Sequence, residues 1–208
     1  MNYEILYAFV MATAALAIAP GPDNIYVLMQ SITYGKKFGL ATVAGLISGC
    51  LIHTTLLAFG VSAIIKESET IFFSIKLLGA LYLFYLAFMV FKSAPDIRLG
   101  ESHLAKKSLL QLFRKGFIMN VLNPKVTIFF LAFFPGFLFS NELSTVVQFY
   151  VLGLLFMVVS FIIFGLIALL SGAISDYITK HSGVGHFLKW LQIFVFVGIG
   201  VYILFSDK

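Results

Sequence analysis

Charged residues are scarce in this sequence. Asp, Glu, Lys and Arg make up 11% of its 208 residues, against roughly 25% in an average soluble domain, while 61% of the residues are hydrophobic. A water-soluble fold of this size could not bury so much apolar surface. The composition therefore excludes an ordinary soluble enzyme or binding domain and favours an integral membrane protein.

Cysteine is almost absent, since Cys50 is the only one and lies within an apolar segment. A single cysteine excludes disulfide frameworks, CxxC redox pairs and cysteine-based zinc sites, and we expect Cys50 to pack as a small apolar side chain. No two of the four histidines have the HExxH or a similar metal-binding spacing. We therefore expect neither a metal site nor a cofactor.

The formal net charge of +5 suggests a nucleic-acid partner at first sight, but the basic residues are not spread over the chain. Six of the 14 fall between residues 92 and 115, between two apolar runs. In a membrane protein such a cluster is an orientation signal. We therefore expect a lipid bilayer and no nucleic acid as partner.

Long apolar runs are abundant, and each reaches the ~20 residues that a helix needs to cross the hydrocarbon of a bilayer. They occupy roughly residues 5–31, 39–65, 70–91, 116–139, 145–171 and 187–205. The sequence thus predicts an all-α integral membrane protein with six transmembrane helices.

The distribution of positive charge predicts the orientation of these spans. Loops after the first, third and fifth spans carry Lys36 and Lys37, the cluster at 92–115, and Lys180, whereas loops after the second and fourth carry one basic residue, Lys66. By the positive-inside rule the first set is cytoplasmic. Both termini are then extracytoplasmic.

The chain divides into two similar halves within a single transporter domain, residues 1–208. The polar segment 93–115 separates three spans in 1–92 from three in 116–208. Residues 16–21 are identical to residues 131–136 at four of six positions. Three spans is an odd number, so a repeat would be inverted across the membrane, as in many secondary transporters.

Gly45 and Gly49 form a GxxxG step that predicts close helix packing and makes a homodimer plausible.

Prolines interrupt the first and fourth apolar runs. Pro20, Gly21 and Pro22 are consecutive, and Pro124 and Pro135 fall in the fourth run. Each proline removes a backbone donor, and lipid cannot satisfy the polar groups exposed at such a break. We therefore expect spans one and four to be discontinuous and their breaks to face a cavity lined by protein. A structural bend closed by neighbouring helices is the alternative.

Polar side chains follow both interruptions. Asp23 and Asn24 come directly after the first, and Asn123 and Lys125 flank Pro124. A buried charge in the membrane costs on the order of 3 kcal/mol or more unless it is paired or hydrated, so these residues indicate function. The predicted topology places Asp23 and Lys125 at a similar depth. The pair would suit a zwitterionic ligand, or would act as an ion pair or gate between the two spans.

His53 falls near the middle of the second apolar run. Histidine changes its charge near neutral pH, which would suit it to relay a coupling proton. A hydrogen-bonded structural histidine is the alternative.

The residues around both interruptions resemble the LysE/RhtB family of amino-acid exporters. The resemblance rests on Ala-Pro-Gly-Pro-Asp-Asn at 19–24, on Asn-Pro-Lys at 123–125 followed by Phe129 and Phe130, and on Lys-Leu-Leu-Gly-Ala-Leu-Tyr-Leu at 76–83. It covers residues 10–140 well, whereas 145–208 match as two further apolar spans.

This resemblance implies a secondary transporter of a bacterial inner membrane that exports amino acids or close derivatives by proton antiport. Basic, neutral and hydroxylated amino acids all remain open as substrates. An exporter of inorganic or metal ions is the nearest alternative, although it would need more acidic, Met or His side chains inside the spans. An enzyme is not expected, because Asp23 is the one carboxylate deep in any predicted span.

Overall fold

The computed structural model describes residues 2–19, 21–62, 69–94, 108–181 and 183–205, and every regular element in these ranges is helical. The first half contains α1 (Tyr3–Ile18), α2 (Pro22–Tyr34), α3 (Lys36–Leu56), the π-helical turn η1 (Leu57–Val61) and α5 (Glu69–Lys92). The second half contains α6 (Leu109–Val121), α7 (Pro124–Phe133), the 3-10 turn η2 (Phe134–Phe137), α8 (Thr145–Leu169), α9 (Ser171–Lys180) and α10 (Gly183–Phe205).

Six membrane spans are present when each bent pair of helices is taken as one span. Four helices in the described part are long and apolar enough to cross a bilayer by themselves: Lys36–Val61, Thr70–Lys92, Thr145–Leu169 and Gly183–Phe205. The other two spans are bent, by 59° between Tyr3–Ile18 and Pro22–Tyr34 and by 52° between Leu109–Val121 and Pro124–Phe137. The prediction of six spans with the first and fourth discontinuous is confirmed.

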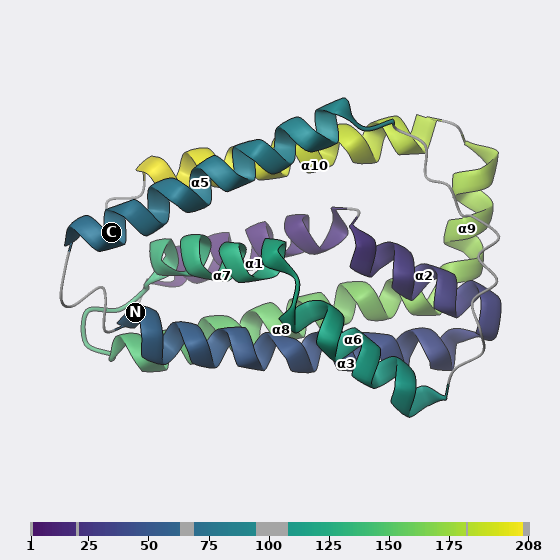
Figure 1. Cartoon of the computed structure of the whole chain (residues 1–208), viewed down its shortest axis with the longest axis horizontal. Helices are drawn as coiled ribbons and strands as arrows, with labels where there is room; N and C mark the ends of the chain where they lie inside the picture. Colours follow the sequence, from purple (N-terminus) through teal and green to yellow (C-terminus); the bar gives the residue numbers. More distant parts are fainter. Residues whose placement is uncertain (1, 20, 63–68, 95–107, 182, 206–208) are drawn as a thin grey trace.

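The helices are arranged in three layers. Figure 1 shows α5 and α10 side by side along one face, α3, α6 and α8 along the other, and α1 and α7 between them. The two ends of the chain lie at the same end of the bundle (Figure 1), as an even number of spans requires. The interruptions that follow α1 and precede α7 lie between the two outer layers, with Asp23, Asn123 and Lys125 partly buried and Leu122 exposed.

The two halves have the same order of elements, an interrupted span followed by two continuous ones. Some boundaries differ from the expected ones. Helix α6 begins at Leu109, so residues 109–115 of the expected polar connector are helical, and α9 occupies part of the expected loop after span five. Ser108 explains the early start of α6, because it forms a capping box with Gln111.

The expected close packing of Gly45 and Gly49 occurs within the chain, between α3 and α6. A Cβ atom on Gly45 would lie 2.0 Å from the Phe113 carbonyl oxygen, and one on Gly116 would lie 2.4 Å from the Thr42 carbonyl oxygen. Glycines on both helices therefore let the two backbones touch. The GxxxG face is covered by α6, so it offers no basis for the expected homodimer.

Phenylalanines form the core around α7. Rings one helical turn apart stack in succession, with centroid distances of 4.4 Å for Phe129 and Phe133 and 4.2 Å for Phe130 and Phe134. Phe9 of α1 packs on the same rings. Other phenylalanines are exposed on the outside of the bundle, among them Phe59, Phe73, Phe88, Phe161 and Phe194. The residue type thus serves both interior packing and the surface that faces lipid.

We expect Gly45→Val to destabilise the fold by about 1–3 kcal/mol or more, because its branched side chain would collide with the backbone of α6. Gly198→Ala in α10 is the matched control, since a Cβ there meets nothing within 4 Å. Thermal unfolding of detergent-solubilised protein measures both. Equal midpoints for Gly45→Val and wild type would contradict the described α3–α6 contact.

Candidate functional site

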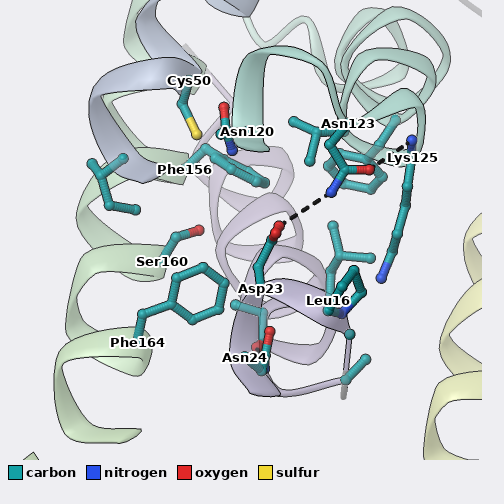
Figure 2. Close-up of a pocket in the computed structure, with 17 residues that line it drawn as sticks. Leu16, Asp23, Asn24, Cys50, Asn120, Asn123, Lys125, Phe156, Ser160 and Phe164 are labelled. Carbon is teal, nitrogen blue, oxygen red and sulfur yellow. Dashed lines mark hydrogen bonds between the residues drawn. The ribbon is translucent and has the colours of Figure 1, made fainter. Parts of the chain in front are cut away.

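The two interruptions are built alike. Gly21 and Asn123 are the N-caps of α2 and α7, and Pro22 and Pro124 take the first helical position of each, where a missing N–H costs nothing. Asp23 and Lys125 follow as equivalent residues (Figure 2). Pro20 lies outside the described residues.

Pro135 does not mark the break in span four. It lies in the 3-10 turn η2 beyond α7, and it is buried. The interruption lies earlier, at Leu122 and Asn123. The structure therefore pairs Pro22 with Pro124, whereas the identities between residues 16–21 and 131–136 would have paired Pro20 with Pro135. The short match between residues 16–21 and 131–136 did not locate the second interruption, because sequence identity inside apolar runs does not depend on where a helix loses its backbone hydrogen bonds.

Asn123 joins the two broken spans. Its Nδ2 donates a hydrogen bond of 3.2 Å to Oδ2 of Asp23, and its Oδ1 accepts one of 3.0 Å from the backbone N–H of Lys125. Figure 2 shows the side chain lying between the other two. One amide thus caps α7 and holds the carboxylate that follows the first break.

Asp23 and Lys125 lie in one site but form no direct ion pair in the described structure. The Lys125 ammonium lies 4.7 Å from the centre of the Phe196 ring, a cation–π contact with α10. It also lies beside Gly21, where an added Cβ would be 3.6 Å from Nζ. Asn123 bonds the Asp23 carboxylate and the backbone of Lys125, while the Lys125 ammonium turns toward α10.

Asn24 and His53 stabilise the interrupted backbones. Asn24 Nδ2 donates to the carbonyl of Ala17 at 2.8 Å, in the last turn of α1, and His53 Nε2 lies 3.1 Å from the carbonyl of Asn120 near the end of α6. Because a carbonyl oxygen only accepts, Nε2 of His53 carries the proton in this contact. The Asn24 bond satisfies a carbonyl that the end of α1 leaves without an intrahelical partner. The His53 bond joins α3 to a carbonyl that also accepts from the backbone N–H of Asn123 at 3.0 Å.

His53 is buried behind the site. Its ring packs against Phe130 with a centroid distance of 5.4 Å, and 4% of the residue is exposed. It does not line the cavity that holds Asp23 and Lys125, and its link to that cavity runs through Asn120. The structure therefore brings Asp23, Asn24, Asn123 and Lys125 together around one cavity and leaves His53 outside it.

The site encloses a narrow cavity. All four polar residues predicted to contact or gate a substrate line it: Asp23, Asn24, Asn123 and Lys125. The cavity offers about 60 Å³ to the centres of water molecules. That is room for a few waters at roughly 10–15 Å³ each, so a larger ligand requires the walls to move apart.

Three polar or polarisable side chains were not predicted as site residues: Cys50, Asn120 and Ser160. Cys50 donates weakly to the carbonyl of Leu46, with Sγ 3.6 Å from the oxygen. Ser160 had a signal in the sequence, because it is a lone hydroxyl in the long apolar stretch 151–170. Its orientation depends on how α8 packs, which the sequence pattern does not specify.

A second cavity lies on the other side of the interruptions, between them and the α5–α10 layer. It has about 360 Å³ and shares Gly21, Pro22, Asn123 and Lys125 with the first. Its remaining lining residues come from α5, α7, α10 and Ser93, which directly follows α5: Tyr82, Leu86, Met89, Val90, Ser93, Pro124, Gln192 and Phe196. The broken backbones thus form the wall between two cavities.

Fold and site together define a multi-pass helical membrane protein with an internal polar site where two interrupted spans meet. The family model described as LysE type translocator matches residues 14–207, and the chain belongs to this family. The match includes residues 145–207, where the sequence resembles the family only in having two further apolar spans.

Curated relatives cover most of the chain. A leucine efflux protein of Klebsiella pneumoniae is 26% identical over 198 residues, which is 95% of this chain and 92% of that protein. Homoserine/homoserine lactone efflux proteins of Salmonella typhimurium and Salmonella typhi are each 29% identical over 178 residues, or 86% of this chain and 85% of theirs. No solved structure gives a significant match.

We expect Asn123→Ala to lower stability by about 2–3 kcal/mol, because it removes the cap of α7 and the donor to Asp23 together. Ser144→Ala is the matched control, since Ser144 caps α8 through Val147 with no bond to an acidic group, and should cost about 1 kcal/mol. Thermal unfolding in detergent measures both. If Asn123→Ala costs no more than Ser144→Ala, the Asn123–Asp23 bond contributes nothing to stability.

Proposed function

We propose that this protein exports amino acids or close derivatives from the bacterial cytoplasm across the inner membrane by proton antiport. The observation that carries the proposal is the cavity in which two interrupted spans present one carboxylate and one ammonium, Asp23 and Lys125. The names of the curated relatives, efflux proteins for leucine and for homoserine and its lactone, support the same class of substrate.

The starts of the two half-helices differ in charge, which favours one orientation of a zwitterion. The N-terminus of α2 already has Asp23 in its first turn, whereas the first turn of α7 has no acidic residue and carries Lys125. A helix N-terminus and a lysine both attract anions. The substrate carboxylate should therefore bind at the start of α7, and its ammonium group should bind Asp23.

The membrane orientation follows the positive charges. With the loops after the first, third and fifth spans in the cytoplasm, Ser93 and the cavity that it lines face the cytoplasmic side, and both termini are extracytoplasmic. Amino acids would then enter through the larger cavity, bind at the interruptions, and leave after the protein opens to the other side. Alternating access around a fixed site between inverted halves is the corresponding mechanism.

We expect inside-out vesicles that contain the protein to take up one class of labelled amino acid, basic, neutral or hydroxylated, when a pH gradient is imposed. Asp23→Asn and Lys125→Ala should each lower this uptake about 30-fold or more, because a hydrogen bond to a charged group contributes about 2 kcal/mol. Asp176→Asn and Lys180→Ala, exposed on α9, are charge-matched controls and should leave uptake unchanged.

Normal transport by both site variants would show that the cavity is not the substrate site. No uptake of any amino acid by verified, inserted protein would overturn the proposed function. The same vesicles would then be tested with inorganic and metal ions, although the described residues contain no group of three His, Cys, Asp or Glu side chains that could hold a metal.

Proton coupling can be separated from the structural role of His53. Gln at this position could still donate to the Asn120 carbonyl but would not titrate. If His53 relays the proton, His53→Gln should lose uptake driven by the pH gradient, about tenfold or more, and keep exchange of labelled for unlabelled substrate. His53→Leu should impair both, because it removes one of the donors to the Asn120 carbonyl, another being the backbone N–H of Asn123. Full gradient-driven uptake by His53→Gln would restrict the histidine to its structural contact.

A further inference from the structure

Ser160 is a buried hydroxyl that lines the cavity and has no hydrogen-bond partner among the described residues. The residue is 2% exposed, and its Oγ contacts no donor or acceptor. Asn120, 5% exposed, lines the same cavity with an unpartnered Oδ1. Leaving buried polar atoms unpaired is unfavourable, so native structures seldom keep them without a reason.

Other hydroxyls in these helices find partners in their own backbone. Ser31, Ser48 and Thr54 each donate to the carbonyl four residues earlier, at 2.7–2.9 Å. Ser160 has no such bond to Phe156, and Figure 2 shows its oxygen pointing from α8 toward the interior of the cavity, on the side of Asp23. The hydroxyl is therefore available to a molecule in the cavity.

The surroundings of Ser160 are apolar. Phe156 and Phe164 lie one turn before and after it on the same face of α8, and both line the cavity (Figure 2). Ile47 of α3 and Phe129 of α7 complete this part of the wall. A substrate held by its charged groups at Asp23 and Lys125 would extend its side chain toward this wall. The side chain would meet an apolar surface in which the Ser160 hydroxyl has no partner.

Resting on the proposed function, we infer that Ser160 is a specificity-determining residue, which binds a hydroxyl on the side chain of the exported amino acid. An apolar side chain of the same shape would fill the space but leave Ser160 unpaired. A site built to bond a hydroxyl discriminates against an analogue that lacks it far more strongly than an apolar pocket discriminates between sizes. Asn120 would add a second polar atom close by.

The test uses pairs of substrates that differ by one hydroxyl: threonine with valine, and homoserine with norvaline. Purified protein in proteoliposomes is assayed by exchange of labelled for unlabelled amino acid. We expect wild type to prefer each hydroxylated member at least about tenfold. Ser160→Ala should lower that preference about tenfold, by reducing transport of threonine and homoserine while valine and norvaline are transported as before or faster.

Thr13→Val is the matched control, because Thr13 is also fully buried with an unpartnered hydroxyl but does not line the cavity. It should leave the preference unchanged. Equal transport of both members of each pair by wild type, or an equal effect of Ser160→Ala on both members, would overturn the inference and leave the proposed function standing. If no amino acid is exchanged at all, the proposed function fails and the inference fails with it.

Discussion

A polypeptide that is interrupted inside a membrane must find partners for its free backbone groups within the protein, because lipid offers none. Here those partners are side chains: Asn24 bonds the Ala17 carbonyl, His53 bonds the Asn120 carbonyl, and Asn123 bonds an N–H at the start of α7. Five of the residues in these contacts also line the central cavity: Ala17, Asn24, Asn120, Asn123 and Lys125. The interactions that stabilise the breaks and those that shape the site are therefore largely the same.

The three-layer arrangement follows from that constraint. Spans with broken backbones have to be enclosed, and α1 and α7 lie between the α5–α10 pair and the α3–α6–α8 layer (Figure 1). Close approach of α3 and α6 depends on Gly45 and Gly116, and tight packing around α7 depends on stacked phenylalanine rings. The continuous spans thus cover the interrupted ones on two sides, while side chains such as Tyr7, Met11 and Leu122 remain on the outer surface.

Much of the fold could be predicted from the sequence, because prolines and charges inside apolar runs are strong local signals. Six spans, the breaks in the first and fourth, and the common location of Asp23 and Lys125 all followed from such signals. What could not be predicted depends on side-chain packing. Asn123 bonds the Asp23 carboxylate while the Lys125 ammonium packs on Phe196, and Ser160 faces the cavity from an otherwise apolar part of α8. The start of α6 at Leu109 was missed because a local capping box outweighed the polarity of the segment.

The residues that divide the two cavities would have to move for a ligand to pass from one cavity to the other. The walls that they share are the broken backbones and the side chains of Asn123 and Lys125, and the bond from Asn123 to Asp23 spans the gap between the two interrupted helices. A hydrogen bond to a charged group contributes about 1.5–3 kcal/mol, which thermal motion can overcome on the timescale of transport. An ammonium group could also replace the Asn123 amide as the donor to Asp23. Substrate binding and the opening of the bond between the two halves would then be a single event, which is the coupling that alternating access requires.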